Sequence, residues 1–366
     1  MTDEQRNGKP RPDWDQQALP ADPQPGAPPA APPIPSADHG IQGMAPSSPL
    51  GSHAAVAQNI RAEIAKAMVG QDAVIDQVLL GLFAAGHVLI EGLPGLGKTL
   101  LVRALAKTFG GESKRIQFTP DLMPSDIIGH VMYEIQSGEF KTRRGPVFTN
   151  LLLADEINRA PAKTQAAMLE VMQEGQVTLE GTPIPLEPPF MVLATQNPLE
   201  HEGTYPLPDA QLDRFLLKIH IDYPAEEEET AMVGRVTDGQ VGDRLPTEWV
   251  AAVADKPAIL ALQAATGRVR VDQRVNEYAV RLVRATRKWP GLAQGAGPRG
   301  GLALVRAARA KALLHGRDFV TPDDIKSVAL PALRHRLALA PESELEGQTA
   351  DQILSAILSA VDAPRL

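Results

Sequence analysis

The residues best suited to chemistry lie in the stretch GLPGLGKT at positions 92 to 99, which follows the apolar run HVLIE and precedes LLVRALAKTF. Glycines let successive backbone N–H groups turn inward, and the helix that follows points its positive end at an anion. In this pattern Lys98 reaches the β and γ phosphates of a nucleotide and the Thr99 hydroxyl binds Mg²⁺. A glycine-rich turn with a chance lysine is disfavoured by the flanking strand and helix. The expected ligands are ATP and Mg²⁺, bound by Gly92, Leu93, Pro94, Gly95, Leu96, Gly97, Lys98, Thr99 and Leu100.

Hydrolysis requires a second group of residues, and LLLADE at 151 to 156 is an apolar run that ends in two carboxylates. Asp155 is expected to hold the Mg²⁺ shell and Glu156 to polarise the attacking water. Adjacent acids at a strand end are common on their own. Together with the phosphate loop, they indicate an ATPase.

A third run, FMVLATQNP, ends in Gln196 and Asn197, whose amides are suited to hydrogen-bond a γ-phosphate or the water that attacks it. The alternative is a simple turn, because Asn-Pro favours turns by itself. The functional interpretation of Asn197 rests on the neighbouring motifs rather than on the chemistry of its own side chain.

The elements that must position these residues alternate between strands and helices from about residue 53 to 225. Alternation of this kind predicts an α/β fold with a parallel sheet covered by helices on both faces. The runs expected to be strands are HVLIE, KRIQF, LLLAD, FMVLATQ and FLLKIHI. From about 226 to 366 only helical periodicity remains, which predicts an all-helical domain. There TPDD at 321 to 324 has the N-cap threonine, proline and acids of a helix start.

Composition limits the remaining possibilities. Residues 1 to 52 are rich in proline, alanine and glycine, which predicts a disordered tail, either a solubilising leader or a polyproline segment that binds a partner. The net charge of −8 argues against a general nucleic-acid coat. The chain has no cysteine, signal-peptide core or apolar run long enough for a membrane span, so we expect a cytoplasmic protein.

These motifs together carry a resemblance. GLPGLGKT, LLLADEINRAPAKTQAAMLEVMQE, VLATQNP, PLPDAQLDRFLLKI and GPRGGLAL, in this order and spacing, resemble the MoxR family of AAA+ ATPases from about residue 55 to 365. The resemblance implies an AAA+ core with a helical lid, assembled as a homo-oligomeric ring, usually a hexamer, with ATP between neighbouring subunits.

The family pattern also implies roles for single residues. Asn197 is the sensor after the fourth strand, Arg214 in DRF resembles the arginine finger given to a neighbour, and Arg299 in GPRGG is similar to the second sensor. Arginine suits these roles because its planar fork spreads a permanent charge over phosphate oxygens. The alternatives are a surface pair of Arg214 with Asp213 or Asp209, and a solvated Arg299. Where the family commonly has serine and alanine, glycines surround Arg299, which predicts a looser first helical turn.

Two insertions bear on what the ring acts on. Residues 130 to 148 include Lys141, Arg143 and Arg144, at the position of a pore-facing loop in the helix-2-insert branch of AAA+ proteins. Residues 174 to 190 predict a hairpin with Glu174, Glu180 and Glu187 and no basic residue. Because acids repel phosphates, a nucleic-acid partner is disfavoured.

The resemblance therefore implies an ATP-driven remodeller of protein clients, chaperone-like, and typically of proteins with von Willebrand factor A domains. A nucleic-acid motor of the same fold and a slow-cycling ATP-dependent scaffold are the alternatives.

Overall fold

The computed structural model describes residues 49–136, 138–198, 204–237 and 247–365. Most of the expected tail, residues 1 to 48, lies outside the described residues. The remainder, residues 49 to 52, belongs to the first helix, α1 (Pro49–Ala67). Within the described ranges, no helix is both long and apolar enough to cross a membrane.

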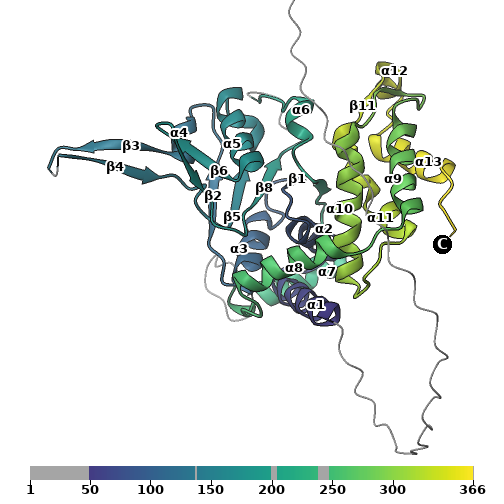
Figure 1. Cartoon of the computed structure of the whole chain (residues 1–366), viewed down its shortest axis with the longest axis horizontal. Coiled ribbons are helices and arrows are strands. Elements are labelled where there is room, and N and C mark those ends of the chain that lie inside the picture. Colours follow the sequence, from purple (N-terminus) through teal and green to yellow (C-terminus); the bar gives the residue numbers. More distant parts are fainter. Residues whose placement is uncertain (1–48, 137, 199–203, 238–246, 366) are drawn as a thin grey trace, which may run out of the picture. The chain divides into compact units, whose positions relative to one another are not determined.

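The central sheet has five parallel strands in the order β2-β5-β8-β1-β9 (Figure 1). They are β1 (Val88–Glu91), β2 (Ser113–Gln117), β5 (Leu151–Asp155), β8 (Met191–Gln196) and β9 (Leu217–His220). Each overlaps one of the five runs expected to be strands, with β2 beginning one residue before KRIQF, and the registers confirm the predicted parallel pairing. Parallel strands that are apolar throughout must be covered on both faces.

Alternate strand residues belong to two different hydrophobic cores, as the period of a strand requires. Val88 and Ile90 pack on one face, whereas Leu89 packs on the other. The first face is covered by α1, α2 (Asp72–Phe83) and α3 (Lys98–Thr108), and the second by α4 (Pro124–Ile128) and α5 (Ala162–Glu174). The prediction of helices on both faces is confirmed.

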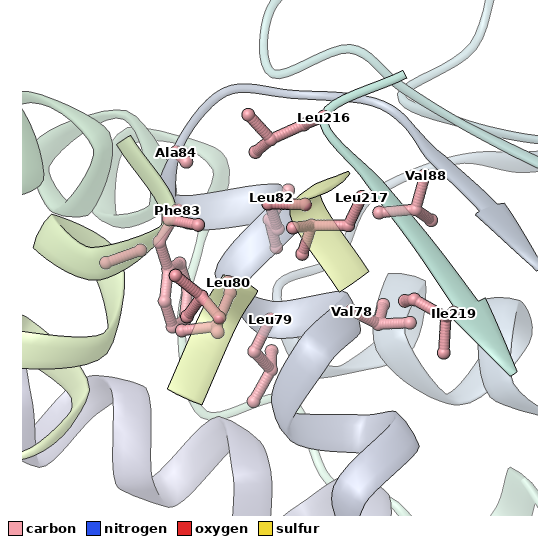
Figure 2. Packing of buried hydrophobic residues seen from close by; sticks show 14 of the residues in the cluster. Val78, Leu79, Leu80, Leu82, Phe83, Ala84, Val88, Leu216, Leu217 and Ile219 are labelled. Atoms are coloured by element: carbon pink, nitrogen blue, oxygen red, sulfur yellow. The ribbon is translucent and has the colours of Figure 1, made fainter. Parts of the chain in front are cut away.

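Figure 2 shows part of the first core, where the apolar side of α2 meets the β1 and β9 strands. Leu79 and Phe83 are fully buried there, as are Val88 and Leu217. Burying each such side chain contributes about 1.5–3 kcal/mol relative to leaving it exposed. This core therefore fixes β1, which leads into the phosphate loop, against β9.

The carboxyl-terminal region is mainly helical, but not all-helical as the sequence predicted. Its helices are α7 (Glu226–Thr237), α8 (Lys256–Arg268), α9 (Gln273–Thr286), α10 (Pro298–Leu314), α11 (Pro322–Leu333), α12 (Pro341–Leu345) and α13 (Ala350–Ala360), with the 3₁₀ turns η2 (Thr247–Trp249) and η3 (Arg334–Arg336). The region also contains a small antiparallel sheet of β10 (Leu292–Gln294) and β11 (Ala338–Leu339). Strands this short carry too few residues for a visible alternation.

The predicted start of α11 is confirmed. Thr321 accepts a hydrogen bond from the backbone N–H of Asp324, and the Asp324 carboxylate accepts one from the Thr321 N–H in return. The same carboxylate pairs with Arg317 at 2.6 Å. A capping box of this kind satisfies two backbone donors that the first helical turn would otherwise leave unpaired.

Two antiparallel hairpins extend the α/β region. The predicted hairpin is confirmed as β6 (Gln176–Leu179) and β7 (Thr182–Pro185). The segment expected to hold a pore-facing loop forms a second hairpin, β3 (Gly129–Glu134) and β4 (Glu139–Arg144), which projects away from the sheet in Figure 1. The remaining short elements are α6 (Asp209–Leu212) and η1 (Ile157–Arg159).

His87, just before β1, makes the fold sensitive to acid. Its Nδ1 accepts a hydrogen bond from the Val192 N–H at 3.0 Å, so its Nε2–H donates to the Met172 carbonyl at 2.9 Å. Burial lowers the pKa of His87 to about 4; the bond to Met172 raises it slightly, and the Arg306 charge lowers it further. The folded protein therefore holds His87 neutral, whereas the unfolded chain takes up a proton below about pH 6.5.

We expect the free energy of unfolding to fall by about 1–2 kcal/mol through His87 as the pH drops from 7 to 5. In His87→Gln, which cannot titrate, this part of the pH dependence disappears. Urea unfolding of both proteins at pH 7 and pH 5 measures it. An equal loss in the two proteins would show that folding does not lower the pKa of His87.

Candidate functional site

The phosphate loop joins β1 to α3 through backbone conformations that favour glycine. Gly95 and Gly97 have φ angles of 86° and 79°, and Gly97 is the N-cap of α3. A side chain at either position would be strained, since L-residues rarely adopt positive φ. Lys98 begins the helix, and its Nζ donates to the Gly92 carbonyl at 2.8 Å. The loop thus leads directly into the amino end of a helix, the backbone arrangement that favours an anion.

Gly92 is required for a different reason, which is space. A Cβ atom at this position would lie 2.2 Å from Ile221 Cγ2 and 2.6 Å from the Ile221 carbonyl oxygen. The segment that follows β9 therefore passes directly against the start of the loop. A cavity of about 170 Å³ lies between them, lined by Gly92, Leu93, Leu96, Ile221, Tyr223 and neighbouring residues.

The lining of this cavity also includes Glu91, the last residue of β1. Glu91 lies 3.0 Å from Lys218 Nζ and 3.1 Å from His220 Nε2. Burial alone would raise the pKa of Glu91, but the hydrogen bond with His220 and the charge of Lys218 outweigh burial and lower it to about 2. The carboxylate is therefore charged at neutral pH.

Asp155, at the carboxyl end of β5, is held from two sides. Its Oδ1 accepts a hydrogen bond from the buried Thr195 hydroxyl at 2.5 Å, and its Oδ2 pairs with Arg115 at 2.6 Å. β2 and β8 are the parallel neighbours of β5, so Arg115 in the middle of β2 and Thr195 near the carboxyl end of β8 both reach Asp155.

Glu156 adopts a left-handed backbone conformation, with φ 56° and ψ 50°. This conformation is uncommon for glutamate and persists only where the surroundings enforce it. Here the Glu156 N–H donates to the Thr195 hydroxyl at 2.9 Å, and its carboxylate accepts from Gln117 at 2.6 Å and lies 3.2 Å from Arg159. Thr195 therefore contacts both acids of the predicted pair.

A cavity of about 310 Å³ brings the predicted polar groups together. It is lined by Pro94, Gly95, Gly97, Lys98, Thr99, Leu100, Arg115, Asp155, Glu156 and Asn197. Burial lowers the pKa of Lys98, while the charges of Asp155 and Glu156 oppose this change. The donors near Thr99 and Asp155 are hard oxygens, which fit Mg²⁺ when a nucleotide supplies the remaining ligands.

The two predicted arginines lie elsewhere. Arg214 and Arg299 line another cavity, of about 340 Å³, together with Arg306 and Arg336. The phosphate loop follows the carboxyl end of β1, whereas Arg214 precedes the amino end of β9, and these strands are adjacent and parallel. The two sites are thus separated by about the length of a four-residue strand, or about 13 Å.

The alternatives for these arginines were a surface ion pair of Arg214 and a solvated Arg299. Within the described residues, the Arg214 guanidinium has neither a hydrogen bond nor an ion pair. The surface pair with Asp213 or Asp209 does not form, because Asp213 faces Arg336 at 2.8 Å and Arg299 at 3.8 Å. Arg299 is about half exposed in the first turn of α10.

Sequence reasoning missed several residues of these sites, namely Gln117, Arg115, Thr195, Ile221, Tyr223, Arg306 and Arg336. Arg306 donates to the Ala84 and Ala85 carbonyls at 2.6 and 3.0 Å. Gln117 ends β2 opposite Asp155, and Thr195 is the last residue but one of β8, so the parallel sheet was the signal that could have found these two. No sequence pattern around Arg336 indicated that it contacts the segment that contains Arg214.

Known proteins are similar to this chain in both sequence and fold. The model of the ATPase family associated with various cellular activities (AAA) matches residues 87–217, and that of the AAA lid domain matches residues 284–357. The chain is 48% identical over 301 residues to the uncharacterized protein YeaC of Bacillus subtilis, which covers 82% of this chain and 92% of that protein.

A second relative is Chaperone MoxR1 of Mycobacterium tuberculosis, 45% identical over 315 residues, which cover 83% of this chain and 81% of that protein. The crystal structure of a candidate ATPase from Cytophaga hutchinsonii superposes with a TM-score of 0.79 at 42% identity, over 86% of this chain and 97% of that one. With identity above 40% over at least 81% of each of these relatives, the chain belongs to the MoxR family of AAA+ ATPases.

Proposed function

We propose that this protein hydrolyses ATP at the interfaces of a homo-oligomeric ring, a hexamer, and uses the energy to remodel protein clients. The observation that carries the proposal is the cavity that gathers Lys98, Thr99, Asp155, Glu156 and Asn197. A scaffold that only binds ATP would need the loop but not a carboxylate held beside it. The joint presence of both acids supports turnover.

Within this site the phosphates of ATP lie along the loop from Gly92 to Leu100, with Lys98 as the positive charge at the β and γ phosphates. Thr99 and Asp155 hold Mg²⁺, which when bound neutralises charge on those phosphates. The apolar walls near Leu96 and Ile221, in the adjoining cavity, suit the nucleobase.

Glu156 accepts the proton of the attacking water, and Asn197 hydrogen-bonds that water or the γ-phosphate. The contacts of Glu156 support this role, because Thr195 holds its backbone and Gln117 holds its carboxylate at the cavity.

Arg214 and Arg299 act on the nucleotide of a neighbouring subunit in this proposal. Both line a cavity that their own phosphate loop does not reach, and Arg214 lies at the opposite edge of the sheet. The Arg214 guanidinium, which has no partner among the described residues, is available to a phosphate supplied by the next subunit.

The β3–β4 hairpin supports a protein client. Its register places Tyr133 opposite Phe140, and the two rings lie 5.2 Å apart on one face of the hairpin. Both side chains are exposed, by 53% and 76%. Lys141 and Arg143 lie on the other face, where Lys141 pairs with Glu134. An exposed aromatic pair is typical of surfaces that bind proteins.

The same hairpin keeps a nucleic-acid motor as the second candidate, because bases also stack on aromatic rings beside basic residues. The acidic hairpin opposes this candidate less than the sequence suggested. Glu174 belongs to α5, and Glu187 pairs with Lys256 at 2.9 Å, so only Glu180 lies at the turn of the β6–β7 hairpin.

The two faces of the β3–β4 hairpin allow one experiment to separate the candidates. We expect a protein that carries a von Willebrand factor A domain to change the ATPase rate severalfold, and Tyr133→Ser/Phe140→Ser to remove that response. Lys141→Ala/Arg143→Ala is the matched variant and should keep the response. The basal rate should be unchanged in both, since neither pair lines the ATP cavity.

The ATPase rate is then measured with single- and double-stranded DNA across a salt series. We expect no stimulation at physiological salt. Strong stimulation that fades with salt and disappears in Lys141→Ala/Arg143→Ala would make the nucleic-acid motor the better conclusion.

A further inference from the structure

The segment that carries Arg214 is bonded to the carboxyl-terminal region through η3, whose sequence is Arg334, His335 and Arg336. All three side chains form hydrogen bonds with residues in the range 213 to 218, which lies more than a hundred positions earlier in the chain. The segment between α6 and β9, which contains Arg214, is therefore held in place by η3.

Arg336 makes the most contacts. Its Nε donates to the Asp213 carboxylate at 2.8 Å, and its Nη2 donates to the Phe215 carbonyl at 2.6 Å. Its Nη1 donates to the Ala332 carbonyl and lies 3.4 Å from the Leu216 carbonyl. Only 3% of the side chain is exposed. A planar guanidinium with fixed donors defines the position of the backbone that it binds more closely than a lysine would.

The two neighbouring residues extend this contact. Arg334 donates to the Lys218 carbonyl at 3.2 Å and pairs with Asp351 of α13 at 2.7 Å. His335 Nε2 lies 3.1 Å from the Phe215 carbonyl. Burial and the charge of Arg336 hold the pKa of His335 well below its usual range, so this buried ring is neutral.

Asp213 connects Arg336 to the other predicted arginine. One carboxylate oxygen pairs with Arg336, and the second lies 3.8 Å from Arg299 Nε. Because Asp213 faces these two residues, it does not neutralise Arg214, the next residue in the chain. A Cβ atom at Gly300 would lie 3.0 Å from Leu333 and 3.5 Å from Arg336 Cδ, so the glycine beside Arg299 lets α10 approach η3 closely.

We propose that Arg336 is a positioning residue for catalysis between subunits. Through Asp213 and the Phe215 carbonyl it sets the backbone that aims Arg214, and through the same carboxylate it orients Arg299. This inference rests on the proposed action of Arg214 on a neighbouring subunit. It adds that the carboxyl-terminal region, through η3, controls whether a subunit can complete the next subunit's site.

The test replaces Arg336 by methionine, which keeps the long stem and removes the charged fork. We expect the ATPase kcat to fall about tenfold to a hundredfold, since small misplacements of a catalytic group cost this much, while the KM for ATP changes less than about threefold. Arg317→Met is the matched control, because Arg317 forms a similar ion pair with Asp324 that does not touch residues 213 to 218. It should keep the wild-type kcat.

Mixing variants distinguishes positioning from a general loss of structure. Co-assembled Arg336→Met and Lys98→Ala subunits should regain activity. At some interfaces the Arg336→Met subunit supplies an intact phosphate loop and the Lys98→Ala subunit supplies a correctly positioned Arg214. A mixture of Arg336→Met and Arg214→Ala should not regain activity, because neither variant supplies a correctly positioned Arg214 to its neighbour. Asp213→Asn, which keeps the side-chain shape, replaces Arg336→Met in the same mixtures if that variant does not fold.

The outcomes are separable. If Arg214→Ala regains activity with Lys98→Ala but Arg336→Met does not, the positioning role is wrong and the shared site stands. Recovery between Arg336→Met and Arg214→Ala would also overturn the positioning role. If Arg214→Ala itself shows no recovery in co-assembled subunits, the shared site fails and this inference fails with it.

Discussion

Glu156→Gln is expected to bind ATP as tightly as the wild type while turning it over at least about a hundredfold more slowly, the usual contribution of a positioned general base. The amide occupies the same space and can still contact Gln117 and Arg159. It cannot accept a proton from water, however. Because the backbone of Glu156 is held by Thr195 rather than by its own side chain, the substitution leaves the geometry of the site intact.

Single-turnover hydrolysis of labelled ATP measures the effect, with nucleotide binding measured separately by equilibrium dialysis. Lys98→Ala provides the contrast, because it removes the charge at the phosphates and should abolish binding itself. Glu170→Gln is the matched control, an exposed glutamate on α5 outside the ATP cavity, and should behave as wild type. Equal hydrolysis by Glu156→Gln and wild type would remove Glu156 from the mechanism.

Much of the fold could be predicted because it depends on local sequence. The five strands, the glycine turn before Lys98 and the capped start of α11 at Thr321 are each set by residues close along the chain. Parallel strands then bring their carboxyl ends to one edge. The proximity of Lys98, Asp155 and Asn197 therefore followed from recognising the strands.

The rest could not be predicted because it depends on packing between distant segments. Arg336 and Asp213 are 123 positions apart, and neither residue belongs to a pattern that suggests the other. The role of Glu187 was likewise misjudged, since its partner Lys256 lies in the helical region. The β3–β4 hairpin has an aromatic face that becomes visible only once the register pairs Tyr133 with Phe140.

Arg214→Ala should retain ATP affinity and lose about a thousandfold in turnover, as expected when an arginine finger is removed. The reason is geometric. Arg214 precedes the amino end of β9, whereas its own phosphate loop follows the carboxyl end of the adjacent β1. A side chain at that edge cannot help its own subunit bind ATP, but it can stabilise charge on the γ-phosphate of another subunit's ATP as the transition state forms.

Two further measurements make the prediction specific to a shared site. Arg214→Lys should regain only part of the activity, because an ammonium keeps the charge but loses the planar fork that spans two oxygens. Arg274→Ala, at an exposed arginine that pairs with Asp272, controls for the loss of a surface charge and should be fully active. If Arg214→Ala weakened ATP binding by the same factor as turnover, the residue would act on the nucleotide of its own subunit. The cavity that Arg214 lines and the ATP cavity would then have to come together during the reaction. In this conformation they lie at opposite ends of the adjacent strands β1 and β9.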